Sequence, residues 1–271
     1  MHSKAFVAGT RVEHYKYLSP IRCGYSRGYR IERRQVLQDK RSANLLRAQR
    51  TVRQIIWANI GNYTKFLTLT YRDTVLDFET FKYNFAAFKK SMSRKGYKLQ
   101  YLYVLERQKE RGEKEGNEGC LHCHLVVFND EYIPYQTIRE AWHYGNIDIH
   151  VLKGVRYQDN HKSHEKINDL AAYVSKYITK DTVALPGNRC FSCSVGLNRP
   201  DTYRDECYMW NVPYGREGID NPDTASLFER LEYSTKFKFT VSSTWSYVSN
   251  GEEKHNTLIY RQGVLENARF I

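Results

Sequence analysis

His122 and His124, separated by one residue, are the first side chains whose types and spacing suggest chemistry. They lie in an apolar run, Leu121–Phe128, that predicts a β-strand, and residues two apart on a strand point to the same face. Two imidazoles on one face supply half of a metal site. Glu106 ends a second predicted strand, Tyr101–Glu106, where a carboxylate among apolar neighbours is costly unless it is paired or metal-bound. If the two strands form a hairpin, Glu106 is the third ligand; the alternative is an ordinary carboxylate at a strand edge.

Tyr173 and Tyr177 are candidate nucleophiles on a predicted helix over residues 167–180. The buried stripe of that helix is marked by apolar residues at helical spacing: Ile167, Ala171, Val174 and Ile178. Residues four apart share one flank of a helix, so the two phenols lie together. At ~100° per residue, Tyr177 lies nearer the buried stripe, which favours core packing, whereas Tyr173 lies toward Lys176. Tyr173, beside the Lys176 ammonium, is therefore the better nucleophile candidate.

The segments that must position these residues alternate between strand and helix patterns. Runs rich in β-forming residues predict strands at 66–71, 101–106, 121–128 and 147–152. Helical periodicity predicts helices after an N-cap at Ser42 and over 77–94, 135–142 and 167–180. Residues 1–40 read as irregular, and two more strands are expected at 237–241 and 244–248. Strands interleaved with helices, joined partly by hairpins, predict an antiparallel sheet with helices packed on it.

Charge points toward a polyanionic partner. The chain of 271 residues carries a net charge of +12, and residues 1–60 hold thirteen basic side chains against three acidic ones. Such a basic segment fits an arm that tracks phosphates, although a solvated helix face is the alternative. The chain also has 22 Tyr and four Trp. Single-stranded bases stack on aromatic rings, so this composition favours a nucleic-acid partner.

Cysteine usage and hydropathy bound the other classes. Six cysteines without a visible signal peptide predict reduced thiols. Cys120, Cys123, Cys190 and Cys193 form two Cys-x-x-Cys pairs that could bind zinc, but the pairs are separated by sixty-six residues, wider than zinc ribbons usually are. The apolar runs are much shorter than the ~20 residues that span a bilayer, so no membrane association is expected.

Taken in order, the Phe66–Tyr71 strand, the His-x-His strand and the sequence Tyr173-Val-Ser-Lys-Tyr177 resemble the HUH endonucleases. The resemblance covers about residues 42–200 and is to the initiators of rolling-circle replication of small phages, of the microvirus type, and of plasmids. One departure is Cys123, because the middle residue of the histidine motif is often bulky and apolar in this family.

The resemblance implies an α+β fold, with a central antiparallel sheet of about five strands and flanking helices (an RRM-like or ferredoxin-like palm). It implies that His122, His124 and a third ligand, for which we choose Glu106, bind a divalent cation, Mg²⁺ or Mn²⁺. Attack by Tyr173 on the scissile phosphate would give a 5′-phosphotyrosine and a free 3′-hydroxyl that primes synthesis. Tyr177 would perform the alternate cleavage, and Lys176 would assist in reaching the phenolate.

These expectations divide the chain into a basic arm and helix (1–60), a catalytic domain (61–185) and a C-terminal extension packed on the core (186–271). The partner is single-stranded DNA at a replication origin, in the cytoplasm of a bacterial host. Since the sequence has no G-x-x-x-x-G-K-[ST] phosphate loop, a host helicase and polymerase are expected to act with it. Three alternatives remain: a relaxase or transposase on the same scaffold, a non-catalytic single-strand-binding protein, and a hydrolase in which zinc activates water.

Overall fold

The structure is a computed structural model. The residues that it describes are 2–18, 33–108, 119–151, 155–158, 161–163, 170–178, 189–204, 224–249 and 252–265. They fall into two compact units, one formed by residues 32–198 and the other by residues 1–31 together with 199–271. These bounds differ from the three consecutive segments expected from the sequence, because the two ends of the chain share one sheet. The central part of the expected hairpin connection, residues 109–118, lies outside the described residues.

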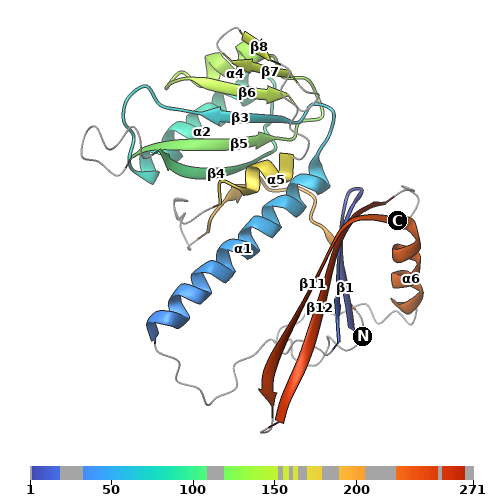
Figure 1. Ribbon diagram of the computed structural model, residues 1–271. Coiled ribbons are helices and arrows are strands. Elements are labelled where there is room, and N and C mark those ends of the chain that lie inside the picture. The colour runs from blue at the N-terminus through green and yellow to red at the C-terminus, as the bar shows by residue number, and fades with distance from the viewer. Residues whose placement is uncertain are drawn as a thin grey trace. The chain divides into compact units, whose positions relative to one another are not determined.

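The unit of residues 32–198 has an antiparallel sheet of seven strands in the order β8-β7-β6-β3-β5-β4-β9 (Figure 1). Its strands are β3 (Lys65–Leu69), β4 (Tyr101–Gln108), β5 (Cys120–Val127), β6 (Ile147–Val151), β7 (Val155–Gln158), β8 (His161–Ser163) and β9 (Ser192–Cys193). Its helices are α1 (Arg33–Asn59), α2 (Phe78–Arg94), α4 (Tyr135–Ala141) and α5 (Leu170–Ser175). The expected α+β class is therefore confirmed. The sheet exceeds five strands because short β7, β8 and β9 extend its edges.

One face of this sheet carries the main hydrophobic core. Strand residues such as Leu69 and Leu125 pack there against the apolar stripe of α2 and against α4. Helix α2 begins after Asp77, whose carboxylate accepts a hydrogen bond from the Thr80 amide at 2.7 Å. Side chains that alternate with the core residues point to the opposite face, where α5 packs. Helix α1 lies alongside α5, and the Gln49 amide donates to the Ile178 carbonyl at 2.8 Å.

Two local predictions were wrong. Helix α1 begins at Arg33, so Ser42 lies within the helix and is not its N-cap. The N-terminal residues, expected to be irregular, form β1 (His2–Ala8) and β2 (Arg11–Tyr17). Among the helices that the structure describes, none combines the length and the hydropathy needed to cross a membrane.

The second unit has a five-stranded antiparallel sheet in the order β10-β1-β2-β12-β11. Its remaining elements are β10 (Asp201–Arg204), α6 (Thr224–Ser234), β11 (Thr235–Ser249) and β12 (Glu252–Leu265). The two strands expected near residue 240 are one continuous strand, β11, paired along its length with β12. Strand β12 also pairs with β2, so the C-terminal hairpin completes a sheet begun by the N-terminal strands.

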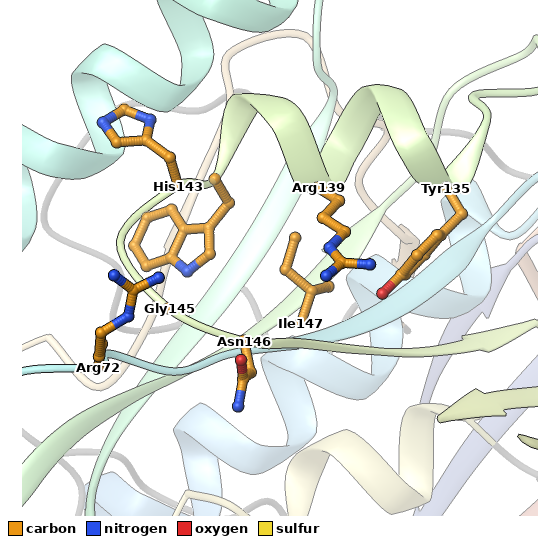
Figure 2. Close-up of a pocket in the computed structure, with 8 residues that line it drawn as sticks. Arg72, Tyr135, Arg139, His143, Gly145, Asn146 and Ile147 are labelled. Carbon is orange, nitrogen blue, oxygen red and sulfur yellow. The ribbon is translucent and has the colours of Figure 1, made fainter. Parts of the chain in front are cut away.

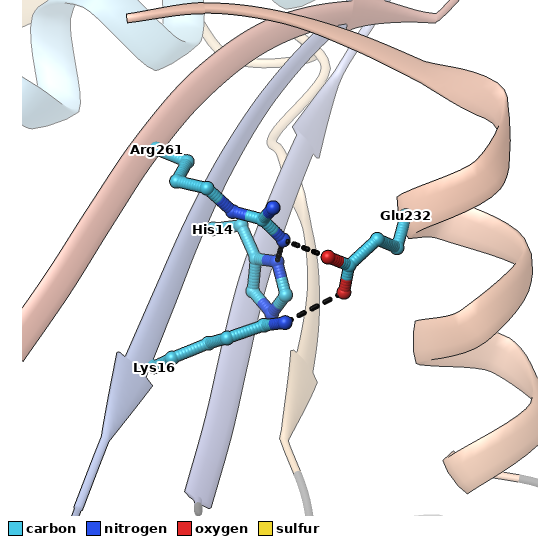
Figure 3. A network of polar contacts seen from close by, with 4 residues as sticks. All are labelled: His14, Lys16, Glu232 and Arg261. Atoms are coloured by element: carbon cyan, nitrogen blue, oxygen red, sulfur yellow. Dashed lines mark hydrogen bonds and ion pairs between the residues drawn. The ribbon is translucent and has the colours of Figure 1, made fainter. Parts of the chain in front are cut away.

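A polar network fixes α6 to this second sheet (Figure 3). The Glu232 carboxylate of α6 accepts from Lys16 at 2.6 Å and from Arg261 at 2.9 Å. Arg261 also contacts Nδ1 of His14 at 3.1 Å, and His14 is buried against the ring of Phe228. Burial, together with the Arg261 and Lys16 cations, lowers the pKa of His14 to about 4. The buried imidazole is therefore neutral at pH 7.

Candidate active site

The β4–β5 hairpin brings the predicted histidine and glutamate residues together. The strands pair antiparallel with Glu106 opposite His122 and Val104 opposite His124, which confirms the expected hairpin. From this register the Glu106 carboxylate reaches diagonally to His124, and Oε2 lies 3.0 Å from Nε2. The His124 side chain is 5% exposed and that of Glu106 is 30% exposed. A buried imidazole thus meets a carboxylate that remains open to ligands.

Strand β3 contributes a residue that the sequence reasoning missed. Thr68 is the register partner of His124, and its Oγ1 lies 3.5 Å from Nδ1 of the imidazole. On the other side of β3, Thr68 pairs with Asp148 of β6. His124 is therefore contacted at both ring nitrogens, which fixes the orientation of the ring. A threonine inside a strand gives no sequence signal of such a role until the register between β3 and β5 is known.

Helix α5 places both tyrosines over this face. The Tyr177 ring stacks on His124 with 3.5 Å between ring centroids and an interplanar angle of 18°. The Tyr177 hydroxyl donates to the Tyr173 hydroxyl at 2.9 Å. Burial, the hydrogen bond to Tyr173, and the nearby Glu106 and Asp148 carboxylates raise the pKa of Tyr177 well above its usual value. Tyr177 packs as expected for a half-buried residue, but its contact is the site histidine rather than the apolar core alone.

Lys176 lies at the solvent side of this cluster. It is exposed, and its Nζ lies 5.9 Å from the centroid of the Tyr173 ring. The described part of α5 ends at Ser175, followed by a turn that holds Lys176 and Tyr177. The tyrosine hydroxyls, the imidazole and the Glu106 carboxylate thus form a continuous series of contacts, with one ammonium group near its outer end.

The donor types present suit a divalent cation, since imidazole and carboxylate are both accepted by Mn²⁺ and carboxylate by Mg²⁺. The contact between Glu106 and His124 is what two ligand groups directed toward one point would make. His122 shares their face of the sheet and lies directly opposite Glu106. Within the described ranges, however, no group of three or more His, Cys, Asp or Glu side chains is already arranged around a single metal position.

The cysteines lie apart from this cluster. Cys120 and Cys123 are buried in the core on the opposite face of the sheet, while Cys190 and Cys193 are half-buried, and all four are free thiols. Burial raises the pKa of the Cys123 thiol well above its usual value. The small Cys123 side chain therefore serves as a core hydrophobe between the two histidines.

Comparison with known proteins agrees with this geometry. The fold and the cluster define an α+β domain in which a tyrosine-bearing helix covers a His-x-His strand. Residues 64–182 match a family of replication-associated proteins of the ORF2 type. The match confirms the resemblance to rolling-circle replication initiators, and the matched segment contains every candidate site residue. No curated protein and no solved structure matches the chain. A role in replication initiation is thus supported in general terms, without the chemistry.

Proposed function

We propose that this protein starts rolling-circle replication by nicking single-stranded DNA at an origin and later rejoining it through a 5′-phosphotyrosine intermediate. The observation that carries the proposal is the uninterrupted series of contacts from Tyr173 through Tyr177 and His124 to Glu106. It brings a candidate nucleophile to a face of the sheet that holds imidazole and carboxylate groups. The family match supports the same reading.

Tyr173 is the proposed nucleophile. Its oxygen accepts the hydrogen bond that Tyr177 donates, and such a bond stabilises a phenolate. The Lys176 ammonium near its ring favours the same charged form. Attack forms the bond between the phenolic oxygen and phosphorus, and the bond from phosphorus to the 3′ oxygen breaks. The 3′ oxygen takes up a proton and leaves as a hydroxyl, which can prime synthesis. Because the phosphodiester energy is kept in the phosphotyrosine, rejoining needs no ATP.

The other residues have supporting roles in this proposal. His122, His124 and Glu106 would hold Mg²⁺ or Mn²⁺, and a cation bound there would polarise the scissile phosphate as a Lewis acid. Glu106 and Thr68 fix the two nitrogens of His124, and the Tyr177 ring covers one face of that imidazole. In the Tyr-to-Tyr hydrogen bond Tyr177 is the donor, so it first positions Tyr173 and then serves the second cleavage.

The partners follow from the reaction. The substrate would be single-stranded DNA at the origin, and a host helicase and polymerase would unwind the duplex and extend the 3′-hydroxyl. A relaxase or transposase would use the same cluster with another DNA context, and no feature of the described residues favours either.

The experiment is a covalent-capture assay with Mn²⁺ and a library of single-stranded circular DNA of random sequence, so that an unknown origin sequence does not limit it. The wild-type protein is expected to form DNA adducts that EDTA prevents, and sequencing the captured DNA identifies the site. Tyr173→Phe and the double variant His122→Ala/His124→Ala should form none, and Tyr177→Phe should form them more slowly. Tyr83→Phe, a change at an exposed tyrosine of the same unit, is the matched control.

Two outcomes would contradict the proposal. If the wild-type protein binds the library but forms no adduct with any divalent cation, the protein is a single-strand-binding protein and not a nickase. If adducts persist in Tyr173→Phe and disappear in Tyr177→Phe, the assignment of the nucleophile is wrong.

A further inference from the structure

A depression of about 360 Å³ lies at the end of β3, within the unit of residues 32–198 (Figure 2). Its size is at the lower end of the range typical of small-ligand sites. Two guanidinium groups, a side-chain amide and several aromatic rings line it, contributed by Arg72, Tyr135, Arg139, Trp142, His143 and Asn146. None of these residues belongs to the cluster around His124, so the depression is a separate feature of the same unit.

The backbone around the depression is fixed by hydrogen bonds. The Thr70 amide donates to Asn146 at 3.0 Å, and the Arg72 amide donates to Tyr144 at 2.9 Å. The buried Trp142 indole donates to the Thr70 carbonyl at 3.0 Å. A Cβ at Gly145 would overlap the Thr70 carbonyl oxygen, so only glycine lets this loop lie directly on the end of β3. The lining residues are thus held in place by rigid elements.

The charge of the depression is positive. Arg72 and Arg139 are exposed side chains that come from two different elements, and no carboxylate is among the lining residues. Glu140, next to Arg139 in the chain, is instead held by Lys95 at 2.7 Å and by Gln136 at 3.2 Å. Guanidinium groups recognise phosphate through paired hydrogen bonds, and exposed aromatic rings stack on bases. The lining therefore matches a nucleotide, with phosphate at the arginines and a ring system at the aromatic side chains.

Strand register places the depression beside the candidate active site. Ile147, another lining residue, pairs with Leu69, which on its other side pairs with Cys123. Cys123 is the residue between the two site histidines. Two strand spacings amount to about 10 Å, so one DNA strand can reach both places by passing over the end of the sheet.

We propose that this depression binds one nucleotide of the single-stranded DNA that flanks the cleavage site. Its phosphate lies between Arg72 and Arg139, and its base packs against Tyr135 or His143. The proposal rests on the proposed function, because it assigns a subsite for the DNA of that reaction.

The test measures binding of a short fluorescent single-stranded oligonucleotide to the full chain, in EDTA so that no cleavage occurs. Arg72→Gln/Arg139→Gln should weaken affinity by about 10- to 100-fold, and the salt dependence of binding should fall by about 0.7 in logarithmic slope for the lost phosphate contact. Arg139→Lys should lose only part of the affinity. Arg94→Gln, which removes an exposed arginine of α2, is the matched control and should retain it. Urea unfolding of each variant verifies that it is folded.

The outcomes separate this inference from the nicking proposal. At saturating DNA the double variant should form adducts to the wild-type level, because the cleavage cluster is intact. If the wild-type protein forms no adducts but the double variant still loses affinity, the nucleotide subsite stands and the nicking proposal fails. Equal losses in the double variant and in Arg94→Gln would overturn the subsite. Thymidine 5′-monophosphate should compete with the oligonucleotide better than inorganic phosphate does, and equal competition would overturn the base contact.

Discussion

Acid should destabilise the sheet that contains His14 more steeply than carboxylate titration alone. The folded protein holds this imidazole neutral with a pKa of about 4, whereas an unfolded chain has the ordinary value of 6.5. The unfolded state therefore binds the extra proton, and stability is complete above pH 6.5 and falls as the pH drops toward 4. The full loss is about 3 kcal/mol, at 1.36 kcal/mol per pKa unit, and about 2 kcal/mol of it is reached at pH 5.

Urea unfolding at pH 7.5 and pH 5.0 measures this loss. The wild-type protein should lose about 2 kcal/mol more than His14→Gln between the two conditions, because glutamine does not titrate. The comparison uses the change with pH within each protein, so a uniform loss of stability in the variant does not affect it. His255→Gln, at an exposed histidine of the same sheet, should behave as the wild type. An equal pH dependence in the wild type and in His14→Gln would refute the reasoning, as would an NMR titration that gives His14 a pKa near 6.5.

Three further predictions concern the unit of residues 32–198. Phe81→Ala should lower its unfolding free energy by about 3–5 kcal/mol in urea, because the ring is fully buried, whereas Tyr83→Ala on the same helix should change it by less than about 0.5 kcal/mol. Glu106→Gln keeps the shape but removes the charge facing His124, and should slow adduct formation by about 10- to 100-fold at unchanged oligonucleotide affinity. Thr68→Val should slow it by about 5-fold and Thr68→Ser should restore it; an unchanged rate in valine would show that the hydroxyl does not orient the imidazole.

Sequence patterns predicted most of the sheet that carries the candidate site, because its signals are local. The expected helix over 77–94 is found as Phe78–Arg94, since its apolar stripe repeats at helical spacing and Asp77 caps it. The strands at 101–106 and 121–128 are confirmed with small changes in their ends. Their pairing could also be expected, because strands close in the chain commonly form hairpins.

The site was only partly predictable for a related reason. Glu106 and the two histidines follow from one hairpin, so alternation along the strands suffices to group them. The contact of Thr68 with His124 depends on the register of β3 against β5, and no local pattern encodes that register. The stacking of Tyr177 on His124 depends on how α5 crosses the sheet, which helical periodicity alone does not give.

The sheet of the second unit was missed because its pairing is remote in sequence. Tyr260 donates to the buried Glu13 at 2.8 Å across 247 positions of the chain. The N-terminal strands are rich in basic and polar residues, so their composition suggested an arm. Their inner residues, such as Val7 and Val12, are buried only through pairing and packing with the C-terminal segment.

That remote pairing sets an order in which the protein can be made. The residues of the unit over 32–198 leave the ribosome consecutively, so this unit can fold while synthesis continues. Strands β1 and β2 are made first, yet β2 has an open edge until β12 is translated. Protection by a chaperone, or by fast folding of the neighbouring unit, would be needed during this interval. A chain interrupted before Glu252 would carry the whole His124 cluster together with an unpaired strand edge, so its aggregates would retain an intact site.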